Sequence, residues 1–396
     1  MQPRGKFFVV VADGAADTPL PELNGKTPFQ AAYMPNLNYL ASKGRLGVVR
    51  TVPEGMHPGS DVANMSILGY DPREYYTGRG PLEAAAMGVE FDDRIIFRCN
   101  LVTVRGGVLE DYSAGHITRE EARELIEALN RWTPFGKFYL GLDYRNLFVL
   151  EGCDEHLQNT PPHDITGKEF ARYMLGPPSN EWAAKLNKLM LDSRQILENH
   201  PVNLRRKEAG KRPANMIWLW GQGRRPRMEP LKQKFGVTGA MISCVYLIKG
   251  MGRLTGMWVP DVPGATGYYD TDLGAKASYA LKAVREEDLD LAYVHVEAPD
   301  EAGHEGNAET KVRMLERIDR ELLGKLLDEV PEASFMFLPD HPTPVRVRTH
   351  TAEPVPAVIY RPGGTGDGLL FDEFSCRRGS LGFLEGTQLM PKFLAR

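Results

Sequence analysis

Short apolar runs alternate with longer amphipathic segments along most of this chain of 396 residues. The apolar runs are rich in β-branched and aromatic residues, which predicts strands. They are Phe7–Ala12, Ile95–Val104, Phe138–Leu140, Asn146–Leu150, Met216–Trp220, Leu291–Val296, Ser334–Leu338 and Ala357–Tyr360. Apolar residues at three- and four-residue spacing predict helices at Gln30–Ser42, Arg119–Asn130, Glu181–Glu198, Thr271–Arg285 and Ala308–Glu329. The alternation predicts an α/β fold with a mostly parallel sheet flanked by helices.

The part of the chain around residues 95–150 has a different pattern. Strands cluster there around one helix, and Gly106-Gly107 marks a turn, which is typical of a smaller α+β unit. A cluster of helix-breaking residues, Leu175–Ser179, precedes the next long helix. We therefore expect a discontinuous core of residues 1–88 and 179–396, and an inserted domain of residues 89–178.

Composition narrows the class of protein. Hydrophobic residues make up 42% and charged residues 25% of the chain, which is typical of a compact globular protein. The net charge of −4 gives no overall attraction to nucleic acid or to an anionic membrane, so we expect neither as a partner. The apolar segment Gly239–Ile248 is too short to span a bilayer and is interpreted as a buried helix. Four widely spaced cysteines favour reduced thiols in a cytoplasmic protein: Cys99, Cys153, Cys244 and Cys376.

Three predicted strands lead into candidate metal ligands. Asp13 follows the first strand, Asp300 and His304 follow Leu291–Val296, and Asp340 and His341 follow Ser334–Leu338. Taken alone, an aspartate after a strand is more often a helix cap or a turn residue. However, the carboxyl ends of parallel strands share one edge of a sheet, so these side chains are expected to converge. Carboxylates with neutral imidazoles suit Zn²⁺, Mn²⁺ and similar ions.

Two further positions extend this candidate site. If Asp300 opens a helix, His304 lies on nearly the same helical face, and His350 supplies another imidazole. Ser60 follows Gly59 at the start of a helical pattern, where a serine is most often an N-cap. Coordination to a metal would instead make its hydroxyl a nucleophile. Motifs of nucleotide-binding phosphate loops, serine hydrolases and zinc proteases do not occur in the sequence.

The segment Arg205–Lys234 is locally basic, with ten Lys or Arg residues against two Glu. A solvated basic face is the simplest interpretation, and nucleic-acid binding is less favoured because few aromatic residues accompany the charges. The third interpretation is a clamp for phosphate and carboxylate groups, which arginine binds in a bidentate manner. Arg224 and Arg227, just after a predicted strand, are well placed for such a clamp.

Six motifs together resemble a known family: Val9–Gly14, Pro58–Asp61, Gly78–Ala84, Ser113–His116, Pro299–His304 and Pro339–Pro344. They are similar to the archaeal-type, cofactor-independent phosphoglycerate mutases of the alkaline phosphatase superfamily, over essentially the whole chain. The resemblance implies an alkaline-phosphatase-like core with two divalent metal ions, Mn²⁺ foremost, with Zn²⁺, Co²⁺ and Mg²⁺ as alternatives. One ion would be held by Asp300, His304 and His350. The other would be held by Asp13, Asp340, His341 and the nucleophile, Ser60.

The resemblance also implies roles in the inserted domain, which would hold the glycerate part of the substrate. His116 matches a family histidine that assists proton transfer and orientation, although alone it would be interpreted as a surface residue. Candidates for binding the substrate anions are Arg79, Arg145, Arg224 and Arg227. The chain departs from many relatives at Asn64, where they carry a histidine.

We therefore expect a mutase that interconverts 3-phosphoglycerate and 2-phosphoglycerate through phospho-Ser60, without a nucleotide and without 2,3-bisphosphoglycerate. Its partner would be a small phosphorylated hydroxy acid, and self-association is left open. The first alternative is a metal-dependent phosphatase or phosphotransferase acting on another hydroxy acid, such as a homoserine kinase-like enzyme. The second is a metal-binding regulatory relative without activity.

Overall fold

The structure, a computed structural model, describes residues 5–90 and 92–395. It divides into two compact units. The first runs to Tyr76 and resumes at Arg227, and the second is Thr77–Pro226. Each unit has its own sheet and its own large apolar core.

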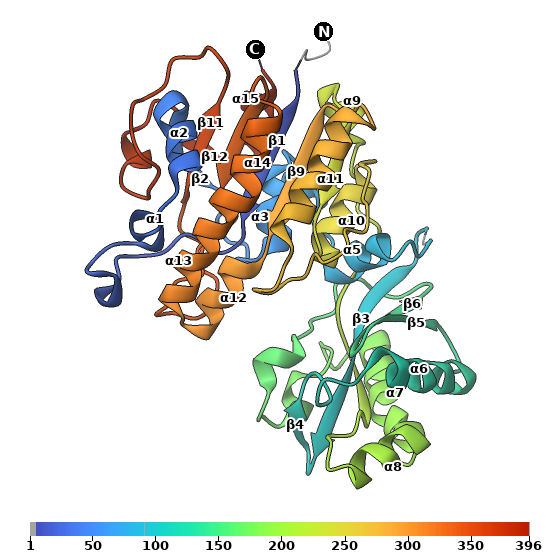
Figure 1. Cartoon of the computed structure of the whole chain (residues 1–396). Helices are drawn as coiled ribbons and strands as arrows, with labels where there is room; N and C mark the ends of the chain where they lie inside the picture. The colour runs from blue at the N-terminus through green and yellow to red at the C-terminus, as the bar shows by residue number, and fades with distance from the viewer. Residues whose placement is uncertain (1–4, 91, 396) are drawn as a thin grey trace. The chain divides into compact units, whose positions relative to one another are not determined.

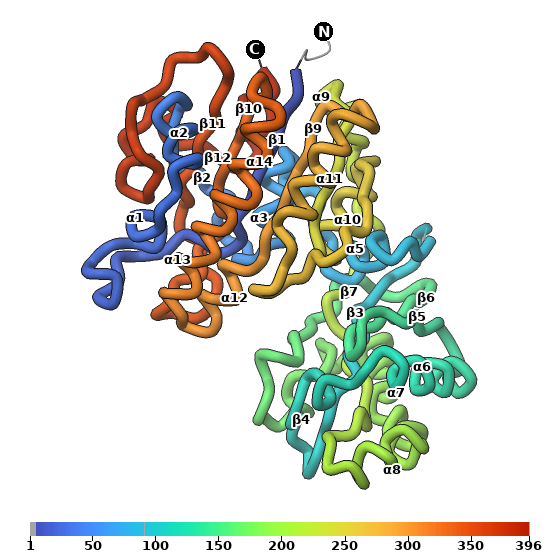
Figure 2. The backbone as a smooth tube through the Cα atoms, viewed as in Figure 1, coloured from blue at the N-terminus to red at the C-terminus, as the bar shows by residue number. Residues whose placement is uncertain are grey.

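A seven-stranded sheet in the order β12-β2-β11-β10-β1-β9-β8 organises the first unit. Its strands are β1 (Phe7–Ala12), β2 (Arg45–Arg50), β8 (Gly239–Ile242), β9 (Leu291–Val296), β10 (Ser334–Leu338), β11 (Val355–Tyr360) and β12 (Gly382–Glu385). Only β11 pairs in the antiparallel sense with its neighbours, and the other pairings are parallel. The remaining six strands therefore run in one direction and end at one edge. In Figure 2, β1 near the N-terminus lies between β9 and β10, which come from the last third of the chain.

Helices cover both faces of this sheet. On one face Phe8 and Val10 of β1 join a core with α2 and α11, and α11, α13 and α14 lie in front of the central strands in Figure 1. On the other face the ring of Phe7 packs against Phe393 of α15, with ring centroids 5.4 Å apart. The α-helices of this unit are α1 (Pro28–Ala31), α2 (Pro35–Lys43), α3 (Ser60–Ile67), α4 (Pro72–Tyr75), α9 (Leu231–Phe235), α10 (Tyr246–Leu254), α11 (Leu273–Arg285), α12 (Ala298–Glu305), α13 (Ala308–Arg317), α14 (Gly324–Glu329) and α15 (Leu389–Leu394). The predicted mostly parallel sheet flanked by helices is confirmed.

The second unit is built on an antiparallel sheet in which β3 pairs with β4, β6 and β7, and β6 pairs with β5. Its strands are β3 (Ile95–Arg105), β4 (Val108–Asp111), β5 (Lys137–Leu142), β6 (Arg145–Leu150) and β7 (Met216–Gly223). Its helices are α5 (Arg79–Ala86), α6 (Arg119–Trp132), α7 (Glu181–Leu197) and α8 (Pro201–Glu208). Gly106 and Gly107 both have positive φ and form the turn between β3 and β4. A smaller α+β unit is present, as predicted.

The limits of the second unit differ from the predicted 89–178. It extends to Pro226 because β7 pairs with β3 from Ile96 to Val102. Helix α7 belongs to the same unit, since its apolar side chains lie in the core built on β3 and β7. The unit begins at Thr77 because α5 packs on β3.

Two other predictions concern the apolar segment Gly239–Ile248 and the four cysteines. Gly239–Ile248 is not one helix, because Gly239–Ile242 hydrogen-bond to β9 as strand β8 and α10 begins only at Tyr246. All four cysteines are free thiols. Among the described residues, none of the helices combines the length and the apolarity needed to cross a membrane.

Candidate active site

Three buried carboxylates converge at the carboxyl edge of the large sheet. Asp13 follows β1, Asp340 follows β10, and Asp300 lies in the first turn of α12, just after β9. Gly14 makes this approach feasible: it has φ of +61°, and a Cβ there would overlap Asp300 and Thr343. Its backbone N–H also donates to Asp340 Oδ1, at 3.1 Å. The glycine after Asp13 is therefore required by the close packing of strand ends.

Ser60 is not the N-cap of its helix. It is the first helical residue of α3, and Gly59 takes the cap position without a side chain to offer. The Ser60 hydroxyl is therefore not used in capping, and its Oγ lies 3.4 Å from both carboxylate oxygens of Asp13 and 3.2 Å from His341 Nε2. The amino end of a helix favours negative charge. This position suits an oxygen nucleophile that receives a phosphoryl group.

Asp13, Asp340 and His341 form the first candidate ligand group, because each offers an atom within 4.8 Å of the others. His341 Nε2 lies 3.4 Å from Asp13 Oδ1 and 3.7 Å from Asp340 Oδ2. With the Ser60 hydroxyl, these are the four side chains that the resemblance assigned to one ion. The structure brings all four together, and their role as ligands stays a prediction.

Asp300, His304 and His350 form a second cluster. Asp300 Oδ2 lies 3.1 Å from His304 Nε2, Asp300 Oδ1 lies 3.5 Å from His350 Nε2, and the two imidazole nitrogens are 3.0 Å apart. His341 can also share a ligand position with Asp300 and His350. The two clusters are therefore neighbours that meet at His341.

Burial and mutual contacts shift the pKa values of the carboxylates and imidazoles in the two clusters. Burial, followed by the neighbouring carboxylates of Asp340 and Asp300, raises the pKa of Asp13 well above its usual value. Burial also opposes the ionisation of Asp300, but hydrogen bonds with His304 and His350 hold its pKa well below its usual value. The hydrogen bond with Asp300 in turn raises the pKa of His304 to about 9. Burial lowers the pKa of His341.

This donor set fits divalent cations. Buried carboxylates that repel one another require compensating positive charge. Asp and His together are ligands of borderline transition metals. The described residues near Asp13, Asp300 and Asp340 supply imidazoles, which can bind such a metal in their neutral form.

Asn64 and Tyr293 also belong to the site. The sequence analysis noted Asn64 but not its contact with Tyr293. The Asn64 amide donates to Asp340 Oδ2 and to the backbone carbonyl of Ser60, both at 2.8 Å. The buried Tyr293 hydroxyl donates to Asn64 Oδ1 at 2.6 Å, so the amide can take only one orientation. The Asn64 amide therefore fixes a candidate metal ligand and the backbone carbonyl of Ser60.

His295 was also missed. It is completely buried in β9, and its Nε2 lies 3.2 Å from Asp13 Oδ2. The buried Lys276 ammonium donates to the His295 carbonyl at 2.7 Å. A single histidine within the apolar strand Leu291–Val296 was the signal that could have revealed it.

Most of the predicted substrate-binding residues lie in the second unit. His116 is exposed in the loop after β4, with φ of +50°, and its N–H donates to Ser113 Oγ at 3.4 Å. Arg145 is exposed at the start of β6, and its guanidinium lies over the Tyr144 ring. Arg79 opens α5 beside Trp220. Their roles stay predictions.

Arg224 and Arg227 differ in their surroundings. Arg224 Nε lies 3.1 Å from Glu155 Oε1, so part of its charge is already paired within the second unit. Arg227 is exposed and belongs to the first unit. Upstream in the same basic segment, three arginines form ion pairs with acidic residues: Arg205 with Glu124, Arg206 with Glu121, and Arg212 with Asp111. Acidic residues of the second unit thus neutralise part of the positive charge that the segment carries within that unit.

Comparisons with known proteins point to one family. The family model for 2,3-bisphosphoglycerate-independent phosphoglycerate mutase matches residues 41–203. The chain is 53% identical over 391 residues to 2,3-bisphosphoglycerate-independent phosphoglycerate mutase 2 of Methanothermobacter thermautotrophicus, and the match covers 97% of this chain and 96% of the relative. The chain belongs to this mutase family.

Other family members and solved structures agree along the full length. The mutase of Methanothrix thermoacetophila is 47% identical, over 98% of this chain and 100% of its own. The solved cofactor-independent phosphoglycerate mutase of Thermoplasma acidophilum is 30% identical, with a TM-score of 0.68 over 98% of this chain and 99% of that chain. A solved Pyrococcus horikoshii protein, also 30% identical, gives 0.84 over 98% and 96%.

Proposed function

We propose that this chain interconverts 3-phosphoglycerate and 2-phosphoglycerate through a phosphoserine at Ser60. The observation that carries the proposal is the Ser60 hydroxyl, which lies 3.2 Å from His341 and 3.4 Å from Asp13 at the amino end of α3. The chain's membership of the mutase family supports the choice of substrate. A partly exposed hydroxyl beside buried candidate ligands and without a capping role is what a covalent mechanism needs.

We further propose that two divalent metal ions, Mn²⁺ foremost, complete the site. Asp300, His304 and His350 would hold one ion, and Asp13, Asp340, His341 and Ser60 the other. When bound, such ions neutralise the carboxylates, lower the pKa of the serine hydroxyl and offset the charge of the phosphoryl group. The proximity of two ligand groups, which meet at His341, supports the number two.

The chain's own residues carry out the transfer in two balanced steps. In the first step Ser60 Oγ loses its proton and forms a bond to phosphorus, the bond from phosphorus to the glycerate oxygen breaks, and that oxygen takes up a proton. In the second step the other glycerate hydroxyl loses its proton and forms a bond to phosphorus, the bond from phosphorus to Ser60 Oγ breaks, and Ser60 Oγ takes up a proton. The phosphoryl group stays on Ser60 until the same glycerate accepts it again, so neither a nucleotide nor 2,3-bisphosphoglycerate is consumed.

The second unit is proposed to hold the glycerate between the two steps. His116 would orient the glycerate and help to move its proton. Arg79 and Arg145 of this unit would bind its anionic groups, with a smaller share for Arg224 because of Glu155. Arg227, which belongs to the first unit, is also proposed to bind a substrate anion. The four free cysteines support a reducing compartment, and we place the enzyme in the cytoplasm.

Metal removal tests the proposal. Exhaustive chelation should abolish the formation of 2-phosphoglycerate, followed with enolase as the coupling enzyme in medium without a nucleotide, and added Mn²⁺ should restore it. Enolase itself needs a metal, so samples are removed from the mutase reaction and assayed separately. Full activity in protein shown to be metal-free by elemental analysis would contradict the proposed site.

A further inference from the structure

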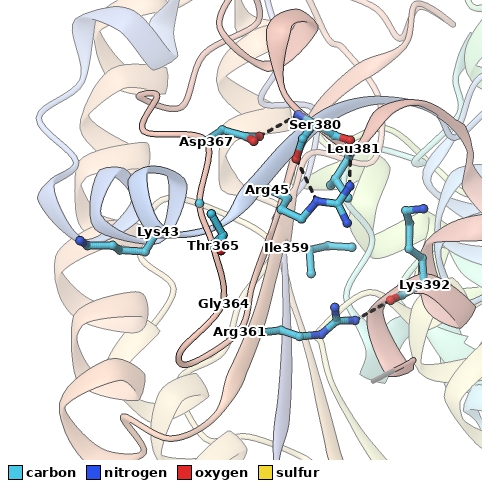
Figure 3. Close-up of a pocket in the computed structure, with 12 residues that line it drawn as sticks. Lys43, Arg45, Ile359, Arg361, Gly364, Thr365, Asp367, Ser380, Leu381 and Lys392 are labelled. Atoms are coloured by element: carbon cyan, nitrogen blue, oxygen red, sulfur yellow. Dashed lines mark hydrogen bonds between the residues drawn. The ribbon is translucent and has the colours of Figure 1, made fainter.

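A cavity of about 480 Å³ in the first unit is lined by several basic side chains. Figure 3 shows Arg45, Arg361 and Lys392 grouped around it, with Asp367 and Ser380 near Arg45. The Lys43 side chain extends away from this group in Figure 3. A cavity of this size is in the range of small-molecule sites.

The cavity lies at the edge of the sheet opposite the candidate active site. Arg45 is the first residue of β2, which runs in the same direction as β1. Arg361 follows the last residue of β11, which runs the other way. Both residues are therefore at the amino edge, whereas Asp13 and Asp340 are at the carboxyl edge. A strand of six residues is about 20 Å long, so a ligand in this cavity does not touch the candidate active site.

The cations of the cavity have unused hydrogen-bonding capacity. Arg361 donates through Nη2 to the carbonyls of Lys392, Phe393 and Ala395, and no bond of its Nε or Nη1 to a described residue is found. Arg45 donates to Ser380 through Nε and Nη2, which leaves Nη1. The Lys392 ammonium makes no ion pair within residues 5–90 and 92–395.

The acidic residue at the cavity does not balance these charges. The Asp367 carboxylate accepts hydrogen bonds from the backbone N–H groups of Leu46 and Ser380, at 2.7 and 2.8 Å. Burial, followed by repulsion from Arg45, lowers the pKa of Arg361. Two guanidinium groups thus line the same cavity, and the one carboxylate among the described residues that line it is already engaged. A bound anion would relieve this repulsion.

We propose that this cavity binds a compact polyanion that carries phosphate or carboxylate groups. Arg45, Arg361 and Lys392 bind its charged groups, since guanidinium forks match such oxygens well. Ile359 and Leu381 in the wall contact its carbon skeleton. Arg361 also donates to the carbonyls of Lys392 and Ala395 at the end of α15. A ligand bound to Arg361 is therefore linked to this helix through the same guanidinium group.

Calorimetric titration of the metal-loaded, full-length protein tests this site, with inorganic phosphate in one arm and malonate in the other. Lys392→Glu is the main variant, because Lys392 is exposed and makes no ion pair with a described residue. Lys26→Glu, at an exposed lysine away from the cavity, carries the same charge change. Any anion bound at the candidate active site contributes equally to both variants.

The wild type and Lys26→Glu should bind an anion in the cavity with a dissociation constant at least about tenfold lower than that of Lys392→Glu. Arg45→Gln should weaken binding in the same direction, and all variants should keep mutase activity. Binding of phosphate alone assigns a phosphorylated ligand, binding of malonate alone assigns a carboxylate, and binding of both assigns either. Titrations that coincide for the wild type and Lys392→Glu in both arms overturn the proposal.

Discussion

At the residue scale, the position of Ser60 is what links the fold to the proposed chemistry. Gly59 occupies the cap of α3, so the serine hydroxyl is free to face Asp13 and His341. Another serine in the same helix, Ser66, is buried, and its Oγ has no hydrogen-bond partner among the described residues. The two serines therefore form a matched pair, one inside the candidate site and one outside it.

Ser60→Ala should lower mutase turnover by at least about 10³-fold, because the other hydroxyl of the cluster, that of Thr343, is buried and donates to Asp300. Its melting temperature should stay close to that of the wild type, since a partly exposed hydroxyl contributes little to stability. Ser66→Ala should keep near-normal turnover. Enolase-coupled rates and thermal unfolding of both variants provide the measurement. Substantial turnover by Ser60→Ala above the blank would rule out the covalent mechanism.

The Tyr293 hydroxyl gives a second prediction at this scale. Tyr293→Phe leaves the buried Asn64 Oδ1 without its donor, which should reduce the free energy of unfolding by about 1–3 kcal/mol. The Asn64 amide also loses its fixed orientation toward Asp340 and Ser60, so turnover should fall about tenfold. Tyr279→Phe, a tyrosine that stacks on Trp258 outside the site, is the control. Equal stability and equal rates for the two variants would show that the Asn64 network has no such role.

The sequence predicted the candidate metal ligands better than the buried residues that contact them. Asp13, Asp300 and Asp340 could be predicted to converge because parallel strands end at one edge. His295 left a local signal, a single histidine in an apolar strand, but Asn64 and Tyr293 could not be assigned in this way. They act through side-chain contacts between α3, β9 and the strand ends, and those contacts depend on packing that no local pattern encodes.

At the scale of elements, the central strands were the easiest to predict. β1, β9 and β10 have the predicted boundaries because they are almost entirely buried and mostly apolar. β2 begins and ends with arginine and contains Gly47, and β12 is only four residues long, so neither has a clear strand pattern. The predicted helix at Gln30–Ser42 is interrupted before Pro35, which opens α2.

Glu373 connects two loops to α1 and gives a pH-dependent prediction. Its carboxylate accepts from the Asp17 N–H and from the hydroxyl of Thr27, the N-cap of α1. Burial raises the pKa of Glu373 from 4.5 to about 7. The folded state therefore holds this proton more tightly than the unfolded state. The stabilisation is complete below about pH 4.5 and is lost as the pH rises through about 7.

Relative to Glu373→Gln, which stays neutral, the wild type should lose on the order of 2 kcal/mol of unfolding free energy between pH 4.5 and pH 8. Urea unfolding of both proteins across this range measures the difference. The Gln variant removes only this titration, so other groups affect both curves alike. Parallel curves would show that Glu373 ionises at its ordinary pKa.

At the scale of the whole molecule, the chain is divided into two units whose limits depend on long-range pairing. The strand Met216–Trp220 was predicted, but its partner was not, because pairing of β7 with β3 joins residues more than 100 positions apart. The second unit therefore spans Thr77–Pro226. Its proposed task is to keep the glycerate bound while the phosphoryl group is on Ser60, which requires that water be excluded from the phosphoserine.

The fate of the phosphoryl group tests the central claim most directly. Purified, metal-loaded protein is incubated with 3-phosphoglycerate, without a nucleotide and without 2,3-bisphosphoglycerate, and timed samples are freed of metal and followed by phosphorus NMR. We predict a growing 2-phosphoglycerate signal with little inorganic phosphate. Release of inorganic phosphate alone, or no change until ATP and a hydroxy amino acid are added, would contradict the mutase and favour a phosphatase or a phosphotransferase.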